Sequence, residues 1–160
     1  MKQGFAIVPV TSGDGGSLYT IQYDGESQSE LDKFLENKEV QKEHSSCSRI
    51  VAKLNEMVHE YGFVREFFKE EEGKRWDYVV ALKEGRLRLY CLRAEDFLLI
   101  VGNGGVKKTR TYQQDSHLNV SVEEMQRVHK LVMNRIYSGR ILVERHSGVL
   151  RGALSFSQER

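Results

Sequence analysis

The sequence predicts an α+β fold in which an antiparallel β-meander packs against an N-terminal helix hairpin and a C-terminal helix. Side chains alternate between apolar and polar over residues 86–93, with the period of two that a strand requires. Residues 97–101 are continuously apolar, which is typical of a central strand buried on both faces. Apolar residues recur at helical spacing over residues 45–61 and 121–136. These patterns together indicate paired strands with helices before and after them.

The length of 160 residues is typical of one domain with an ordinary hydrophobic core. We expect residues 1–139 to form that domain, and residues 140–160 to be a C-terminal extension whose polar end is consistent with partial disorder. The formal net charge of +1 gives no general attraction to nucleic acid or to an anionic membrane. A function of that kind must therefore rest on a local patch of charge.

The two cysteines, Cys47 and Cys91, form neither a Cys-x-x-Cys pair nor a cluster with histidine. We therefore expect no zinc site and no disulfide framework, but free, buried thiols. The N-terminal segment has no signal-like apolar stretch, and no apolar run is long enough to cross a membrane. The expectation is a cytoplasmic protein without a metal or another cofactor.

The chain begins with two predicted strands. Residues 5–10 are expected to form an edge strand, because Pro9 has no N–H to donate to a neighbouring strand. Residues 11–17 have the glycine and serine content of a loop, but they lack the Gly-Lys-Ser/Thr ending of a phosphate-binding loop. Residues 18–23 alternate and are rich in β-forming side chains, which predicts the second strand.

Two predicted helices follow these strands. Ser27 and Glu30 have the spacing of a capping box, which is expected to open a short helix. A longer helix is expected over residues 45–61, and Gly62 is well placed to end it. A short polar link between the two helices predicts an antiparallel hairpin.

The meander begins after a second loop. Residues 63–68 are apolar and are expected to be extended, and residues 69–75 have the charge of a solvated loop. Residues 76–82 predict a strand, and residues 83–85 predict a turn into the alternating strand at 86–93.

The last strand of the meander leads towards the final helix. Residues 94–96 are expected to connect the two neighbouring strands, and the apolar strand at 97–101 is expected to end in the glycines of residues 102–105. Ser121 and Glu124 form a second capping box, which predicts a helix that Gly139 closes.

Basic charge is concentrated in and after this meander. Residues 83–112 hold seven basic side chains against three acidic ones, whereas the rest of the chain holds 17 and 20. Two paired strands would bring a row of cations and a phenol to one side of the sheet. Such arginines are also typical of a solvated strand face, and lysines after glycines are typical of a surface loop. The side chains concerned are Arg86, Arg88, Tyr90, Lys107, Lys108 and Arg110.

This order of elements resembles the RelE/ParE-like toxins of bacterial toxin–antitoxin modules. The motif at residues 104–109, Gly-Gly-Val-Lys-Lys-Thr, is similar to a signature of the phage Gp49-like and HigB-like branch, and the arginine-bearing strand at 87–90 fits the same branch. The resemblance covers residues 18–136 and is dense between residues 76 and 111. The chain departs from the family in its greater length, its lower basic charge and the absence of a proline after the Lys-Lys-Thr motif.

The resemblance implies that residues 1–139 are a RelE-like domain and that the protein is a toxin of a type II system. The implied activity is that of an mRNA interferase, a metal-independent, ribosome-associated endoribonuclease that directs a ribose 2′-OH at the adjacent phosphate. The implied partners are an antitoxin protein and RNA, with no membrane. This chemistry requires cations to stabilise the phosphorane, a group that takes the 2′-OH proton and a group that protonates the leaving oxygen.

The candidate side chains divide by these roles. Arginine forks match two phosphate oxygens, lysines can reach the phosphate or the RNA backbone, and aromatic rings can stack a base. A histidine near the end of the strands is the candidate for proton transfer. The expected catalytic residues are Arg88, Lys107, Lys108 and Arg110, and the expected RNA-binding residues are Arg86, Tyr90, Tyr112 and His117.

Two other classes of function stay open at this point. The same fold could act as a non-catalytic binding module on a protein target, as in the gyrase-poisoning branch of the family. It could also be a relative that merely holds RNA in a basic groove, which the near-neutral net charge favours. The clustered arginine, lysine and tyrosine side chains favour RNA over a protein target.

Overall fold

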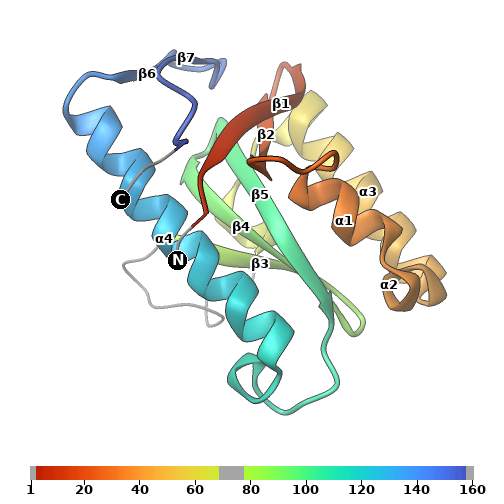
Figure 1. Cartoon of the computed structure of the whole chain (residues 1–160). Helices are drawn as coiled ribbons and strands as arrows, with labels where there is room; N and C mark the ends of the chain where they lie inside the picture. Colours follow the sequence, from red (N-terminus) through yellow and green to blue (C-terminus); the bar gives the residue numbers. More distant parts are fainter. Residues whose placement is uncertain (1–2, 69–77, 158–160) are drawn as a thin grey trace.

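A five-stranded, mostly antiparallel sheet forms the centre of the protein in the computed structural model, which describes residues 3–68 and 78–157 (Figure 1). The strand order is β1-β2-β5-β4-β3, and only β2 and β5 run parallel to each other. The meander β3-β4-β5 and the α+β class that the sequence predicts are confirmed. The strands are β1 (Phe5–Gly13), β2 (Gly16–Tyr23), β3 (Val79–Glu84), β4 (Leu87–Glu95) and β5 (Leu98–Val106).

Helices cover both faces of this sheet. One face carries three consecutive helices, and the opposite face carries the long C-terminal helix (Figure 1). The helices of the first face are α1 (Glu30–Glu36), α2 (Lys38–Lys42) and α3 (His44–Glu56), which the π-helical turn η1 (Met57–Tyr61) extends to Gly62. The helix of the second face is α4 (Ser116–Tyr137). Short 3-10 turns, η2 (Arg65–Phe67) and η4 (Tyr112–Gln114), lie in the connections.

The two faces of the sheet have separate hydrophobic cores. Leu89 and Cys91 of β4 pack in the core beneath α1–α3, whereas Tyr90 and Leu92 pack in the core beneath α4. The predicted alternation of β4 is therefore confirmed. Arg88 is 6% exposed and Tyr90 is 0% exposed, because α4 covers the face on which the phenol lies.

Several element boundaries differ from those expected. The loop predicted at residues 11–17 is only a turn at Asp14 and Gly15 in the structure, because β1 and β2 pair as far as Gly13 and Gly16. β1 lies at one edge of the sheet, as expected, and its pairing with β2 shifts in register by a bulge next to Pro9. β5 continues through the glycines at which it was expected to end, because β4 pairs with it up to Val106.

Both predicted capping boxes are wrong in position. Ser29, rather than Ser27, caps α1, with its hydroxyl accepting a hydrogen bond from the Asp32 N–H at 3.1 Å. α4 begins five residues before Ser121, where Asp115 Oδ1 accepts from the Leu118 N–H at 3.0 Å. A helix start is decided by which side chain reaches the unpaired N–H groups, and the sequence spacing alone does not decide this.

The segment after α4 is packed onto the domain. It forms the hairpin of β6 (Ile141–Val143) and β7 (Leu150–Gly152), and Ile141, Leu150 and Phe156 lie in the core beneath α4. The backbone N–H of Phe156 donates to the Phe5 carbonyl at 2.7 Å, so the chain returns to β1.

Residues 63–68, expected to be extended, contain η2 instead.

The predicted charged loop at residues 69–75 and the first two residues of the predicted strand at 76–82 lie outside the described residues. Among residues 3–68 and 78–157, no helix combines the length and the apolar character needed to cross a membrane.

Candidate functional site

The parallel strands β2 and β5 part at Thr20. Their pairing runs only from Ser17 opposite Leu98 to Thr20 opposite Val101, after which β5 pairs with β4 alone. The Thr20 hydroxyl donates to the Val101 carbonyl at 2.7 Å and accepts from the Leu31 N–H at 3.3 Å. One side chain thus holds both strands and satisfies an N–H in the first turn of α1. Crevices beyond the carboxyl ends of neighbouring parallel strands are common ligand sites in proteins.

His117 lies over β5 beside this division of the strands. Its Nε2 is 2.7 Å from the Gly104 carbonyl oxygen, and since a carbonyl can only accept, Nε2 carries the proton. In the neutral ring Nδ1 therefore holds the lone pair. A Cβ on Gly105 would lie 3.3 Å from the ring carbon Cδ2, so the glycine lets the imidazole sit close to the strand. The structure thus orients the one histidine that the sequence placed near this site.

Arg88 and Tyr90 lie on β4, and Tyr112 lies in the turn η4 before α4. Arg88 is paired with Gly105 across β4 and β5, and the Tyr90 and Tyr112 rings meet edge-on with centroids 6.3 Å apart. Arg88 Nη1 donates to the carbonyls of Gly85 and Leu87, each at 2.9 Å. These hydrogen bonds hold the buried guanidinium of Arg88 against the backbone. The role of Arg88 at a phosphate and the role of Tyr90 at a base stay predictions.

Arg86 and Lys108 are directed to carboxylates at the helices of the first face. Arg86 Nε donates to Glu43 Oε1 at 2.8 Å, and Lys108 forms an ion pair with Glu39. The hydrogen bond from Lys108 and its charge hold the pKa of Glu39 below its usual range. The hydrogen bond to Glu43 and its negative charge raise the pKa of Arg86.

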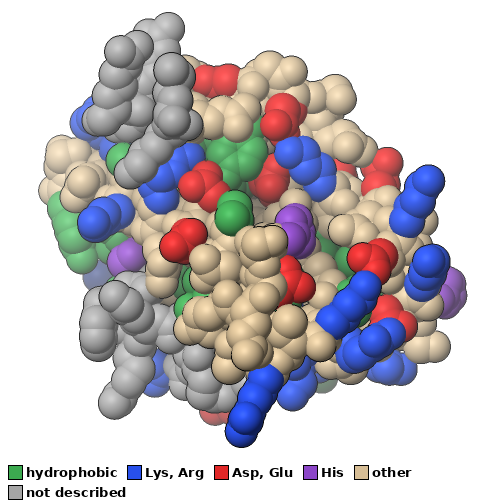
Figure 2. Space-filling model, turned by 60° about the horizontal axis from the view of Figure 1, so that its bottom comes forward, with side chains coloured by type: hydrophobic (Ala, Val, Ile, Leu, Met, Phe, Trp, Pro, Cys, Tyr) green, Lys and Arg blue, Asp and Glu red, His purple; other side chains and the backbone are tan. Residues whose placement is uncertain are grey.

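The remaining predicted residues, Lys107 and Arg110, follow β5 in the chain. Lys107 is half-buried, and its N–H donates to the Arg86 carbonyl at 2.7 Å, whereas Arg110 is exposed. On the face shown in Figure 2, Lys and Arg side chains are interspersed with Asp and Glu and do not form a continuous basic surface. The predicted basic strand face is therefore divided between a buried arginine, paired surface cations and the segment leading into α4.

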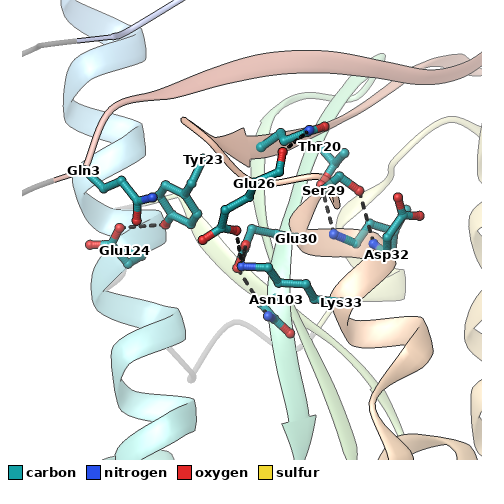
Figure 3. A network of polar contacts seen from close by, with 12 residues as sticks. Gln3, Thr20, Tyr23, Glu26, Ser29, Glu30, Asp32, Lys33, Asn103 and Glu124 are labelled. Atoms are coloured by element: carbon teal, nitrogen blue, oxygen red, sulfur yellow. Dashed lines mark hydrogen bonds and ion pairs between the residues drawn. The ribbon is translucent and has the colours of Figure 1, made fainter.

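A pocket of about 240 Å³ opens where β2 and β5 separate. Its polar lining consists of His117, Gln3, Ser121 and one side chain from each of four elements: Tyr23 of β2, Glu30 of α1, Asn103 of β5 and Glu124 of α4. The Tyr23 hydroxyl donates to Glu124 Oε1 at 2.6 Å, and Asn103 Nδ2 donates to Glu30 Oε1 at 3.2 Å (Figure 3). Burial, and then the hydrogen bond to Glu124, raise the pKa of Tyr23, so the phenol stays protonated.

Sequence reasoning did not find these four residues. Tyr23 was expected only as the end of a strand, Glu30 and Glu124 as capping residues, and Asn103 as part of a glycine-rich exit. The one available signal was the polar Asn103 among glycines, on a strand that is otherwise apolar.

Within the part of the chain that the structure describes, no group of three or more His, Cys, Asp or Glu side chains is arranged to hold a metal ion. Comparison of the chain with protein-family models, with curated proteins and with solved structures gave no match in any of the three.

Proposed function

We propose that the protein is the toxin component of a type II toxin–antitoxin system and that it cleaves messenger RNA, on the ribosome, without a metal. The layout supports this proposal, since the helices α1–α3 follow β2, the meander β3-β4-β5 follows them, and α4 comes after the meander. The observation that carries it is the contact between His117 and Gly104, which directs a ring nitrogen away from the strand at the segment that resembles the family's signature.

The chemistry follows from this orientation. His117 Nδ1 takes the proton of a ribose 2′-OH, the 2′ oxygen attacks the adjacent phosphorus, and the bond from phosphorus to the 5′ oxygen breaks. Lys107 and Arg110 lie on the same segment and supply positive charge for the phosphorane oxygens. The leaving oxygen takes its proton from the imidazolium or from water. Arg88 supports the strand pair beneath the site through its two backbone hydrogen bonds.

A second function has an observation of its own in its favour. Arg88 is buried against backbone carbonyls, and Arg86 and Lys108 are paired with carboxylates. A site whose cations are already engaged is better suited to holding RNA or a protein than to stabilising a phosphorane. In that case the domain binds its target without cutting it.

Expression in a bacterial host, with growth followed and primer extension carried out on messenger RNA, tests both functions. We expect arrest with new cuts inside translated messages, and a reduction of the cuts by at least about 100-fold in His117→Gln. His44→Gln, at an exposed position of α3, is the matched control and should cut like the wild type.

The other outcomes separate the alternatives. Arrest without cuts would favour the binding module over the nuclease. Growth without arrest and without cuts would overturn the toxin proposal. Equal cutting by the wild type and by His117→Gln would remove the histidine from the mechanism but keep the activity.

A further inference from the structure

β5 carries one residue more than β4 where the two strands pass Tyr90. The register of the pair shifts there, so that Gly102 and Asn103 of β5 together lie opposite Tyr90 of β4. An extra residue of this kind is a β-bulge, which locally interrupts the pairing and changes the direction of the groups beside it. The next residue is Gly104, whose carbonyl oxygen accepts from His117. The proposed general base is therefore held by the first residue after the bulge.

The side chain of Asn103 is hydrogen-bonded at both ends of its amide. Its Oδ1 accepts from the Gly104 N–H at 2.7 Å. Its Nδ2 donates to Glu30 Oε1 at 3.2 Å (Figure 3), and Lys33 Nζ lies 2.8 Å from Glu30 Oε2. If the amide turned over, its NH₂ group would face the Gly104 N–H and its oxygen would face the carboxylate. The amide of Asn103 therefore has one favourable orientation.

Gly104 connects Asn103 to His117 through the backbone. Asn103 holds the N–H of this glycine, and the carbonyl of the same glycine accepts from His117 Nε2 at 2.7 Å. A glycine can adopt a wide range of backbone conformations, so the direction of its carbonyl depends on what holds it. A Cβ on Gly104 would lie 1.9 Å from the Arg88 carbonyl oxygen, so β4 limits the movement of this residue on one side. The Asn103 hydrogen bond and the close approach of β4 together fix the acceptor of the imidazole.

His117 depends on this acceptor for its orientation. The side chain lies in the first turn of α4 and is exposed. Within residues 3–68 and 78–157, the bond to Gly104 is the one hydrogen bond of the imidazole. An exposed side chain that loses its single hydrogen bond can populate its other rotamers. A change in the direction of the Gly104 carbonyl would therefore change where Nδ1 points.

We propose that Asn103 is a positioning residue for the cleavage, which acts through Gly104 on the imidazole of His117. Its hydrogen bonds fix the carbonyl that accepts from Nε2, and this leaves Nδ1 directed at the 2′-OH. A general base must lie within hydrogen-bond reach of the proton that it takes, so a misdirected ring loses most of its effect. The inference rests on the proposed function for this reaction, whereas the orientation of His117 can be measured without it.

Nuclear magnetic resonance of the purified protein tests the orientation in the absence of RNA. The couplings between the Hα and Hβ protons of His117 report whether the side chain holds one rotamer. We expect one rotamer in the wild type and averaged couplings in Asn103→Ala. Asn119→Ala is the matched control, because it removes another asparagine, two residues after His117 in α4, and it should keep the wild-type couplings. Unchanged couplings in Asn103→Ala would overturn the proposal.

An exchange of partners tests whether the hydrogen bonds of Asn103 matter or only its volume. Asn103→Asp places a carboxylate against that of Glu30, so the two repel each other and His117 should lose its fixed rotamer. Glu30→Gln combined with Asn103→Asp exchanges donor and acceptor, and this combined variant should restore the couplings. Far-ultraviolet circular dichroism checks that each variant is folded. A folded combined variant with averaged couplings would contradict the proposed hydrogen-bond chain.

Primer extension in cells tests the effect on the reaction. The cuts should fall at least about 10-fold in Asn103→Ala and recover in the combined variant. In the His117→Gln background, Asn103→Ala should cause no further reduction, because it acts through the ring. A further reduction of the same size would show that Asn103 acts independently of His117, and the positioning role would be rejected.

The failure of this inference and that of the proposed function are distinguishable. Averaged couplings in Asn103→Ala, without cuts by the wild type, would reject the nuclease and keep the control of His117 by Asn103. Cuts that depend on His117, with wild-type couplings and wild-type cutting in Asn103→Ala, would keep the nuclease and reject the positioning role.

Discussion

The guanidinium carbon of Arg135, in α4, lies 3.7 Å from the ring centroid of Phe156, near the C-terminus. Arg135 Nη1 also donates to the carbonyls of Ala153 at 2.8 Å and of Ser155 at 2.6 Å. The ring of Phe5 also stacks on the ring of Phe156, with the two ring centroids 4.6 Å apart. One aromatic ring therefore joins the last segment of the chain to its first strand and its longest helix.

Phe156→Ala should lower the free energy of unfolding by about 3–5 kcal/mol, because it removes a fully buried ring and leaves a cavity. Urea denaturation followed by circular dichroism measures this change. Ser157→Ala, at the exposed neighbouring residue, should change stability by less than about 0.5 kcal/mol. A loss below 1 kcal/mol for Phe156→Ala would mean that the segment does not unfold together with the domain.

Neighbouring glycines of β5 should respond differently to the same added methyl group. A Cβ on Gly104 would lie 1.9 Å from the Arg88 carbonyl oxygen, which is backbone and can move only by opening the strand pair. Gly104→Ala should therefore destabilise the protein by about 2 kcal/mol or more. Gly105→Ala meets the His117 side chain at 3.3 Å, which can turn aside, so it should be much less destabilising. Thermal unfolding of the two variants compares them, and equal losses would contradict this account.

Glu84 ties β3 to α3 and should make stability depend on pH. Burial opposes the charge of this carboxylate, but hydrogen bonds from Lys53 and Arg49 outweigh it and hold its pKa below the usual range. A lowered pKa in the folded state stabilises the fold above the pKa of the unfolded carboxyl, about 4.3, and this contribution is lost as the pH falls through the folded value.

Glu84→Gln should thus lower stability by about 1 kcal/mol at pH 7, and the difference should shrink below about pH 4. Urea unfolding of both proteins from pH 7 to pH 3 measures it. Glu123→Gln, at an exposed position of α4, serves as the control. A difference between Glu84→Gln and the wild type that stays constant with pH would argue against the ion pairs.

The two cysteines should differ in their accessibility to thiol reagents. Cys91 is 0% exposed and burial raises its pKa, whereas Cys47 is half-buried. A disulfide exchange reagent should therefore label Cys47 in the native protein, and Cys91 only when denaturant is added. Cys47→Ser should abolish the native labelling. Fast native labelling of that variant would show that β4 opens readily.

The order of β1 to β5, α1, α3 and α4 could be predicted from the sequence because these elements carry their own periodicity, whereas α2 and the short strands β6 and β7 were not predicted. The period of two in β4 correctly assigned Leu89 and Cys91 to one face. It could not tell whether the opposite face was covered, because that depends on where α4 docks. The burial of Arg88 could not be predicted for the same reason. The sequence does not distinguish a buried arginine that donates to backbone carbonyls from a solvated arginine.

The pocket could not be predicted, for a different physical reason. Tyr23, Glu30, Asn103 and Glu124 come from four elements, and what brings them together is the parallel pairing of β2 with β5. Parallel pairing between strands so distant in sequence leaves no local pattern in either strand. His117 could be proposed because it closely follows the glycine-rich strand, although its orientation by Gly104 could not.

The same parallel pair has a consequence for how the protein is made. Thr20 and Val101 are 81 residues apart, so β2 leaves the ribosome long before its partner strand is synthesised. Until then the edge of β2 that later pairs with β5 has unpaired backbone N–H and C=O groups, which can pair with other chains. Contacts of such high sequence separation also slow folding. Nascent chains that are stalled before β5 has emerged should therefore depend on chaperones more than chains that have reached α4.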